Sequence, residues 1–309
     1  MADSAAVAAG TTPARRRSRG LPERRLATFM VAPSMILIAV VAVWPIVYAI
    51  WLSLHEYSLR VAGLSRWASP AGLGNYIDAL KSQEFWSATR ITFVFTICSV
   101  VLETLLGLAM ALIMHAAFKG QGLLRTTVLV PWAVLTVVTA IMWKTIFDPN
   151  LGFVNAILGT KTVWLGEEPQ ALMVMIFADV WKTAPFMALL LLAGLQVIPT
   201  EIYEAARVDG ATAWQRFRKI TLPLLMPALL VALIFRTLDA LRAFDLPKVL
   251  TNGANGTTTL SLEAFRTFQE NRLYGEGSAL SILTFIIVMA VSFAYIRLVG
   301  GNIRGMTEE

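Results

Sequence analysis

Charged side chains interrupt two of the apolar stretches in this sequence. In "FADVWKTAPF", Asp179 and Lys182 stand three residues apart, and in "FRTLDALRAFD" Arg236, Asp239 and Arg242 repeat that spacing. Residues three apart share one face of a helix, so each stretch predicts a helix with a charged stripe. A charge in hydrocarbon is costly unless it faces a partner or a water-filled cavity. We therefore interpret these stripes as internal ion pairs, as the wall of a polar passage, or as both.

Aromatic residues accompany the charged stripes. Trp181, Phe186 and Phe244 offer ring faces close to carboxylates and hydroxyls, a combination that suits the C–H faces and hydroxyl groups of a sugar. Aromatic residues in a membrane span also serve plain packing or an interfacial belt. Glu103 stands alone in a third apolar stretch. It is either a proton site or, as we favour, a structural hydrogen-bond partner of another helix.

A short charged segment separates the two charged stripes. It runs through "IPTEIYEAARVDGATAWQRFRKITLPLLMP", residues 198–227, and carries Glu201, Glu204, Arg207, Asp209, Arg216, Arg218 and Lys219. Thr200 is placed to cap a helix that begins at Glu201, and Gly210 suits a chain reversal at positive φ. Residues 211–220 then predict a second short helix before Pro223 begins the next apolar stretch.

Two alanines give this segment a possible docking face. Ala205 and Ala206 follow Glu204, so a helix here could enter a groove closely and offer one carboxylate for an ion pair with a partner protein. The alternative is an amphipathic helix that rests on lipid headgroups. The residues alone leave both interpretations open.

Motifs for catalysis are not found. The sequence holds no G-x-x-x-x-G-K-[ST], so it predicts no ATP site of its own, and it holds no nucleophile motif or clustered carboxylate pair. His55 and His115 have no metal-ligand companion at useful spacing. We expect a chain that is not an enzyme, binds no metal or cofactor and takes any energy from elsewhere.

The composition requires membrane helices to position these residues. Of 309 residues, 57% are hydrophobic and only 15% charged, and the apolar residues form blocks long enough to cross a bilayer. We predict an all-α membrane protein with six transmembrane helices, at residues 27–52, 88–115, 126–146, 171–196, 223–241 and 278–298. Lys and Arg concentrate beside alternate ends of these spans, which predicts that both termini and the charged segment are cytoplasmic.

This topology divides the chain into three parts. Residues 1–25 are small, polar and then basic, and predict a disordered cytoplasmic tail. We expect residues 26–299 to form the six-span domain, in which residues 198–222 of the charged segment are a loop between two spans. Residues 300–309 form a cytoplasmic C-terminal tail.

The charged segment resembles a known family signature. "EAARVDGATAWQRFRKITLP" is similar to the EAA motif of ABC importer permeases, in which this segment is a cytoplasmic coupling helix that docks on a separate ATPase subunit. The resemblance implies that Glu204 is the ion-pair partner of the ATPase and Gly210 the turn residue. The coupling positions that it implies are Glu204, Ala205, Ala206, Arg207, Asp209, Gly210, Leu222 and Pro223.

The likeness extends over nearly the whole chain. "APSMILIAVVAVWPIVYAIWLSL", "VWKTAPFMALLLLAGLQVIP" and "FDLPKVLTNG" resemble the first permease of carbohydrate importers of the maltose and trehalose type, with actinobacterial trehalose permeases especially similar at "FRTLDALRAFD". The resemblance implies the type I ABC importer permease fold in a bacterial inner membrane. It also implies a second homologous permease, two ABC ATPase subunits that bind ATP and Mg²⁺, and an extracytoplasmic solute-binding protein or lipoprotein. The cargo is then a carbohydrate such as trehalose or maltose.

A set of substrate-pathway positions follows from the charged stripes, the aromatic residues and this resemblance. They are Asp179, Trp181, Lys182, Thr183, Phe186, Arg236, Asp239, Ala240, Arg242, Ala243 and Phe244. Two rival functions stay open. A permease for glycerol 3-phosphate or another solute would use Lys182 and Arg242, and a proton-coupled carrier would use Glu103 and Asp179.

Overall fold

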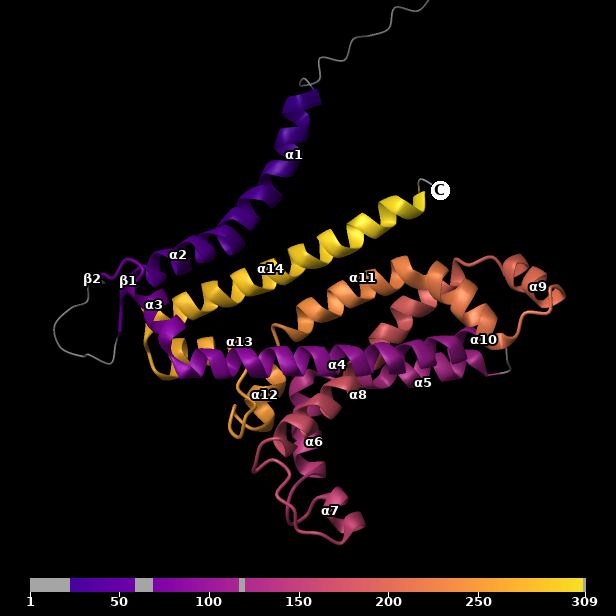
Figure 1. Ribbon diagram of the computed structural model, residues 1–309. Helices are drawn as coiled ribbons and strands as arrows, with labels where there is room; N and C mark the ends of the chain where they lie inside the picture. The colour runs from indigo at the N-terminus through magenta and orange to yellow at the C-terminus, as the bar shows by residue number, and fades with distance from the viewer. Residues whose placement is uncertain (1–22, 59–68, 117–119, 308–309) are drawn as a thin grey trace, which may run out of the picture. The chain divides into compact units, whose positions relative to one another are not determined.

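The computed structural model describes residues 23–58, 69–116 and 120–307 (Figure 1). The described part is almost entirely helical, with a single pair of two-residue strands. The elements are α1 Glu23–Ile38, η1 Ala39–Val43, α2 Trp44–Ser53, β1 His55–Glu56, β2 Ser69–Pro70, α3 Gly74–Lys81, α4 Gln83–His115, α5 Gln121–Ala133, α6 Thr136–Ile146, α7 Phe153–Leu158, α8 Gln170–Gln196, α9 Thr200–Val208, α10 Ala213–Arg216, η2 Phe217–Thr221, α11 Leu222–Ala240, α12 Asp245–Leu250, α13 Leu260–Phe265, η3 Arg266–Glu270 and α14 Tyr274–Thr307, where η marks a π-helical turn.

The chain forms two compact units, residues 1–48 and 49–309. The first unit contains α1, η1 and the beginning of α2. Most of the tail predicted at 1–25 lies outside the described residues, and Glu23 to Arg25 already belong to α1. The helical stretch Ala27–Ser53, which continues into the second unit, is 27 residues long and apolar enough to cross a bilayer. The first predicted span is therefore confirmed.

Four further candidate spans lie in the second unit, at Gln83–His115, Gln170–Gln196, Ala213–Ala240 and Tyr274–Tyr295. The third predicted span, 126–146, is not one straight helix. It is divided into α5 and α6, which meet at an angle of 89°. Pro131 lies near the end of α5, where it removes a backbone donor, and Val134 is extended. Counting this bent pair as one span gives the six that the sequence predicts.

Helices α4, α8 and α11 form the centre of the second unit. Helix α4 packs along α8, and α11 contacts both (Figure 1). Gly107 permits the close approach, because a Cβ atom there would lie 2.7 Å from Cγ of Met187 on α8. Small residues at helix contacts allow the dispersion contacts that stabilise helix pairs in lipid. Three clusters of buried apolar side chains fill the spaces between these helices and their neighbours.

One face of α4 is polar although it is buried. Thr92, Thr96, Ser99 and Glu103 follow one another at intervals of four, three and four residues, and each is at most 3% exposed. These intervals place all four on one helix face. The hydroxyl of Thr92 accepts a hydrogen bond of 2.9 Å from the backbone N–H of Leu260, which holds the start of α13. Four polar side chains of this mostly apolar helix thus point into the protein.

The charged segment forms two helices, as predicted, but their boundaries differ. Helix α9 begins at Thr200 after Pro199 and has no side-chain cap, so the predicted capping by Thr200 is wrong. The second helix begins at Ala213, where Thr212 and Gln215 form a capping box. It is not separate from the fifth span, because α10, η2 and α11 run on as one helical stretch from Ala213 to Ala240. The helix that contains the fifth span therefore begins at Ala213, ten residues before the predicted start at Pro223.

The last predicted span is also longer in the structure. Helix α14 extends from Tyr274 to Thr307, so residues 300–307 of the predicted C-terminal tail continue the helix.

Candidate functional site

Arg236 on α11 is the centre of a buried charged cluster. Its guanidinium group binds Glu103 on α4 through two nitrogens, with 2.8 Å between Nη2 and Oε1. It also pairs with Asp179 on α8, and its Nη1 lies 3.1 Å from Oδ2 of Asp239. The hydroxyl of Thr183 contacts both Glu103 and the carbonyl oxygen of Asp179. One cation therefore joins carboxylates from three helices.

Burial differs sharply among the members of this cluster. The side chains of Arg236 and Glu103 are 3% and 0% exposed, that of Asp179 is 14% exposed, and that of Asp239 is 71% exposed. Removing charges from water is expensive, and only close, hydrogen-bonded pairing offsets the cost. The cluster meets that condition at its buried end. At Asp239 it opens toward solvent.

The outcome differs between the two predicted charged stripes. The pairing of Arg236 with Asp239 on one helix face is confirmed. Asp179 shares a face with Lys182 but pairs with Arg236 instead, so pairing within that stripe is not formed. Glu103 bonds to side chains of two other helices, which confirms its interpretation as a structural hydrogen-bond partner.

A small cavity of about 160 Å³ lies against this cluster. It is polar, and it brings together nine of the eleven predicted substrate-pathway residues. Its lining consists of Thr136, Asp179, Lys182, Thr183, Arg236, Asp239, Ala240, Arg242, Ala243, Phe244, Asp245 and Leu246. Three carboxylates and three cations thus face one space, which suits a solute with many hydroxyl groups.

The other two predicted pathway residues lie outside the cavity lining. The ring of Trp181 packs edge-on against Trp143, with centroids 6.2 Å apart. The ring of Phe186 stacks on Trp132 at 5.5 Å. Both rings therefore pack between α8 and the bent α5–α6 pair, and their place on the substrate pathway stays a prediction.

Sequence reasoning missed three lining residues. Thr136 is the first residue of α6, and the bend between α5 and α6 brings it to the cavity. Pro131 was the available signal for that bend. Asp245 and Leu246 begin α12, directly after Phe244. A short helix at this position had no periodicity long enough to predict it.

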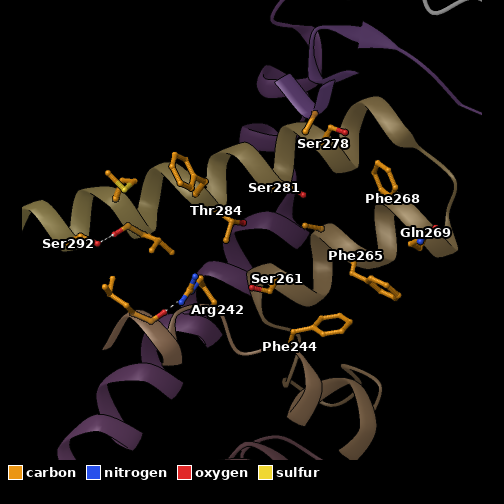
Figure 2. Close-up of a pocket in the computed structure, with 16 residues that line it drawn as sticks. Arg242, Phe244, Ser261, Phe265, Phe268, Gln269, Ser278, Ser281, Thr284 and Ser292 are labelled. Carbon is orange, nitrogen blue, oxygen red and sulfur yellow. Dashed lines mark hydrogen bonds between the residues drawn. The ribbon is translucent and has the colours of Figure 1, made fainter. Parts of the chain in front are cut away.

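A larger groove of about 760 Å³ adjoins the cavity, and Arg242 and Phe244 line both. Figure 2 shows the hydroxyls of Ser278, Ser281 and Thr284 along α14 on one side of the groove, with Phe244 and Phe265 on the other. The guanidinium group of Arg242 is held there by a 3.2 Å bond to the carbonyl oxygen of Leu238. The lining of this groove is mostly apolar, in contrast to that of the cavity.

The predicted coupling positions follow the C-terminal end of α8 in the chain. Glu204, Ala205, Arg207 and Asp209 are exposed on and just after α9, and Ala206 is half-buried. Among the described residues, none of the charged side chains of α9 forms an ion pair within the chain.

The turn after α9 adopts the predicted geometry. Gly210 has φ of +76° and no atom within 4 Å of an added Cβ, so backbone conformation alone favours glycine there. The N–H of Ala211 donates to the carbonyl oxygen of Ala206 at 2.9 Å, which closes the helix. Leu222 and Pro223 begin α11 inside the continuous helical stretch Ala213–Ala240, so Pro223 removes one backbone donor from that stretch.

Residues 103–306 match the family model described as binding-protein-dependent transport system inner membrane component. The chain belongs to this family. It is a multi-pass inner membrane permease of an ABC importer, a transport component that is not itself catalytic and that works with an ATPase and a periplasmic binding protein. The family resemblance of the charged segment is thereby confirmed.

Named relatives and solved structures agree with this assignment. The trehalose/maltose transport system permease protein MalF of Thermococcus litoralis is 45% identical over 282 residues, which cover 89% of this chain and 94% of the relative. The trehalose transport system permease protein SugA of Mycobacterium tuberculosis is 42% identical over 285 residues, 92% of each chain. A chain in the crystal structure of a bacterial ABC transporter for the acidic polysaccharide alginate superposes with a TM-score of 0.77 over 89% of the permease and 95% of that chain. At 22% identity, this last match shows the fold alone.

Proposed function

We propose that the permease carries a neutral disaccharide of the trehalose or maltose type across the membrane. The observation that carries the proposal is the cavity beside Arg236, in which carboxylates, cations and the ring of Phe244 face one small space. Ionised side chains bind sugar hydroxyls well, because carboxylates accept and guanidinium groups donate in fixed directions. Two relatives at 42–45% identity are named for trehalose or maltose transport, which supports the same class of solute.

The proposed cavity is part of a shared site. Ligand pockets usually measure roughly 300–1,000 Å³, whereas this cavity measures about 160 Å³. A disaccharide therefore needs a larger binding site than this cavity alone supplies. We propose that a second, homologous permease provides it in a heterodimer, with two ATPase subunits and an extracytoplasmic binding protein completing the complex.

The charged segment is the proposed coupling element. Both termini and α9 then lie on the cytoplasmic side, in keeping with the basic residues beside them. The exposed carboxylate of Glu204 is available to a cation in a groove of the ATPase subunit. Closure of the ATPase pair on ATP would draw the coupling helices together and turn the permease pair from inward-facing to outward-facing. This step is alternating access, with no bond chemistry in the permease.

The charge of the cavity distinguishes between the candidate solutes. Three lining cations, Lys182, Arg236 and Arg242, are matched by three lining carboxylates, so there is no surplus of positive charge for a phosphate. This balance favours a neutral sugar over glycerol 3-phosphate. A proton-coupled carrier is favoured by no further observation, because Glu103 and Asp179 are both engaged by Arg236.

Uptake by the reconstituted complex tests this function. The permease, its partner permease, the ATPase and the binding protein are placed in liposomes, and import of labelled trehalose, maltose and glycerol 3-phosphate is measured with and without ATP. We expect ATP-dependent import of a disaccharide that a protonophore does not stop. Import of glycerol 3-phosphate alone, or import without ATP, would refute the proposal.

A further inference from the structure

Glu103 contacts two residues of the cavity wall, Arg236 and Thr183, but does not itself line the cavity. Its side chain is completely buried on α4, and it is absent from the residues that face the cavity. Both of its oxygens are bound by Arg236, and one also meets the hydroxyl of Thr183. Arg236 and Thr183 are themselves cavity residues. Glu103 therefore fixes how two wall residues present their remaining polar groups.

The position of Glu103 also decides the sign of the local charge. Three carboxylates and three cations line the cavity, so the lining is balanced when all are charged. Glu103 adds a fourth carboxylate directly behind the wall. The cavity lining and Glu103 together then carry one excess negative charge, and Coulomb repulsion near a low-dielectric wall is stronger than in water.

We propose that Glu103 is a positioning and specificity-determining residue, which orients Arg236 and Thr183 and makes the cavity disfavour acidic solutes. The proposal rests on the proposed role of the cavity as the sugar pathway. It assigns to Glu103 more than pairing with the buried Arg236, because a purely structural partner would affect the stability of the cluster and not the selectivity of the cavity.

The charge can be measured in the cavity without any sugar. Cys98 is the single cysteine of the chain, so Cys98→Ser combined with Ala243→Cys places one thiol in the cavity lining. In the assembled transporter, this thiol is reacted with a cationic and an anionic methanethiosulfonate of similar size. The ratio of the two rates reports the local potential, and the anionic reagent serves as a small acidic solute.

Four variants in this background separate charge from packing. Glu103→Gln keeps the shape and removes the charge, and we expect the cationic-to-anionic rate ratio to fall roughly fivefold. Glu103→Asp keeps the charge and should keep most of the ratio. Glu103→Gln with Arg236→Gln removes both charges of the pair, so the ratio should recover toward the original value. Thr96→Val is the matched control, because Thr96 is a buried α4 residue whose hydroxyl has no partner in the described structure.

The outcome decides the proposal in either direction. An unchanged ratio in Glu103→Gln, or an equal fall in Glu103→Gln and Glu103→Asp, would overturn it. If Glu103→Gln does not assemble, the double variant Glu103→Gln/Arg236→Gln is compared with Arg236→Gln alone. These two proteins differ only in the carboxylate of Glu103, so the cationic-to-anionic rate ratio should be lower in the double variant. Failure of sugar import together with the expected change in ratio would refute the proposed function and leave the role of Glu103 in the cavity intact.

Discussion

The cluster around Arg236 and the charged segment at residues 198–227 are both rich in charge, but their charged side chains differ in burial and pairing. In the cluster, Arg236 and Glu103 are almost fully buried, and their polar atoms find partners on other helices of the same chain. In the charged segment, Glu204 and Arg207 are exposed, and in the described structure neither forms an ion pair. Buried charges require partners within the fold, whereas exposed charges stay hydrated and are free to pair with another protein.

This difference separates stability from coupling. Loss of a buried partner leaves an uncompensated charge at a buried position, so the stability of the fold should fall. Loss of an exposed charge costs the isolated chain little, because water replaces whatever contact it made. Variants in the first region should therefore change unfolding, and variants in the second should change transport.

The largest effect is expected at Arg236. Arg236→Met leaves Glu103 and Asp179 without their shared cation, and we expect the free energy of unfolding to fall by about 3–5 kcal/mol. Thermal unfolding of the purified transporter in detergent measures this loss. Arg242→Met is the control, because Arg242 is exposed and donates only to the carbonyl oxygen of Leu238 within the described structure. Equal unfolding temperatures for the two variants would show that burial does not distinguish them.

The next largest effect is on transport alone. Glu204→Ala should reduce import per ATP hydrolysed roughly tenfold or more, since truncating one partner of a charged interface contact is costly. The unfolding free energy should change by no more than about 0.5 kcal/mol, because the side chain is exposed. Glu201→Ala, on the same helix and also exposed, is the matched control. A loss of stability that matches the loss of import, or the same loss of import in the control, would contradict the assignment of Glu204 to the ATPase contact.

The sequence predicted that the charged residues of the spans would pair or face water, because an isolated charge in hydrocarbon is costly. Asp179 and Arg236 had to face inward or toward water, and both do. The choice of partner could not be predicted, since Asp179 had Lys182 one turn away and Arg236 on another helix. Only the packing of α8 against α11 decides between them. Spacing along one helix carries no information about its neighbour.

Boundaries were less predictable than spans. Pro223 suggested the start of a helix, but it lies inside a continuous helical stretch, two residues after the π-helical turn Phe217–Thr221. The chain bends at Val134, three residues after Pro131, where the sequence predicted a continuous helix. In both cases the presence of proline alone does not decide whether a helix begins, bends or continues.

A smaller effect on coupling is expected at Gly210, where backbone geometry rather than charge is involved. Its φ of +76° lies in the left-handed region, and there is open space around an added Cβ. Gly210→Val should therefore cost about 1 kcal/mol through strain alone and reduce import several-fold. Gly210→Asn, which tolerates this conformation better, should retain most of the import. If the two variants import equally, the turn does not need the left-handed conformation for coupling.

The smallest effect is expected for an ion pair outside both regions. Arg90 and Glu168 lie 2.8 Å apart, but their side chains are 64% and 42% exposed. An exposed pair gains little over hydration, so Arg90→Ala should lower the free energy of unfolding by no more than about 1 kcal/mol. The effect should shrink further in 1 M salt, where the Debye length is about 3 Å. Measuring the free energy of unfolding of Arg90→Ala and Arg236→Met at low and high salt compares the exposed pair directly with the buried cluster. A salt-insensitive loss at Arg90 as large as that at Arg236 would mean that distance, and not burial, governs the strength of these pairs.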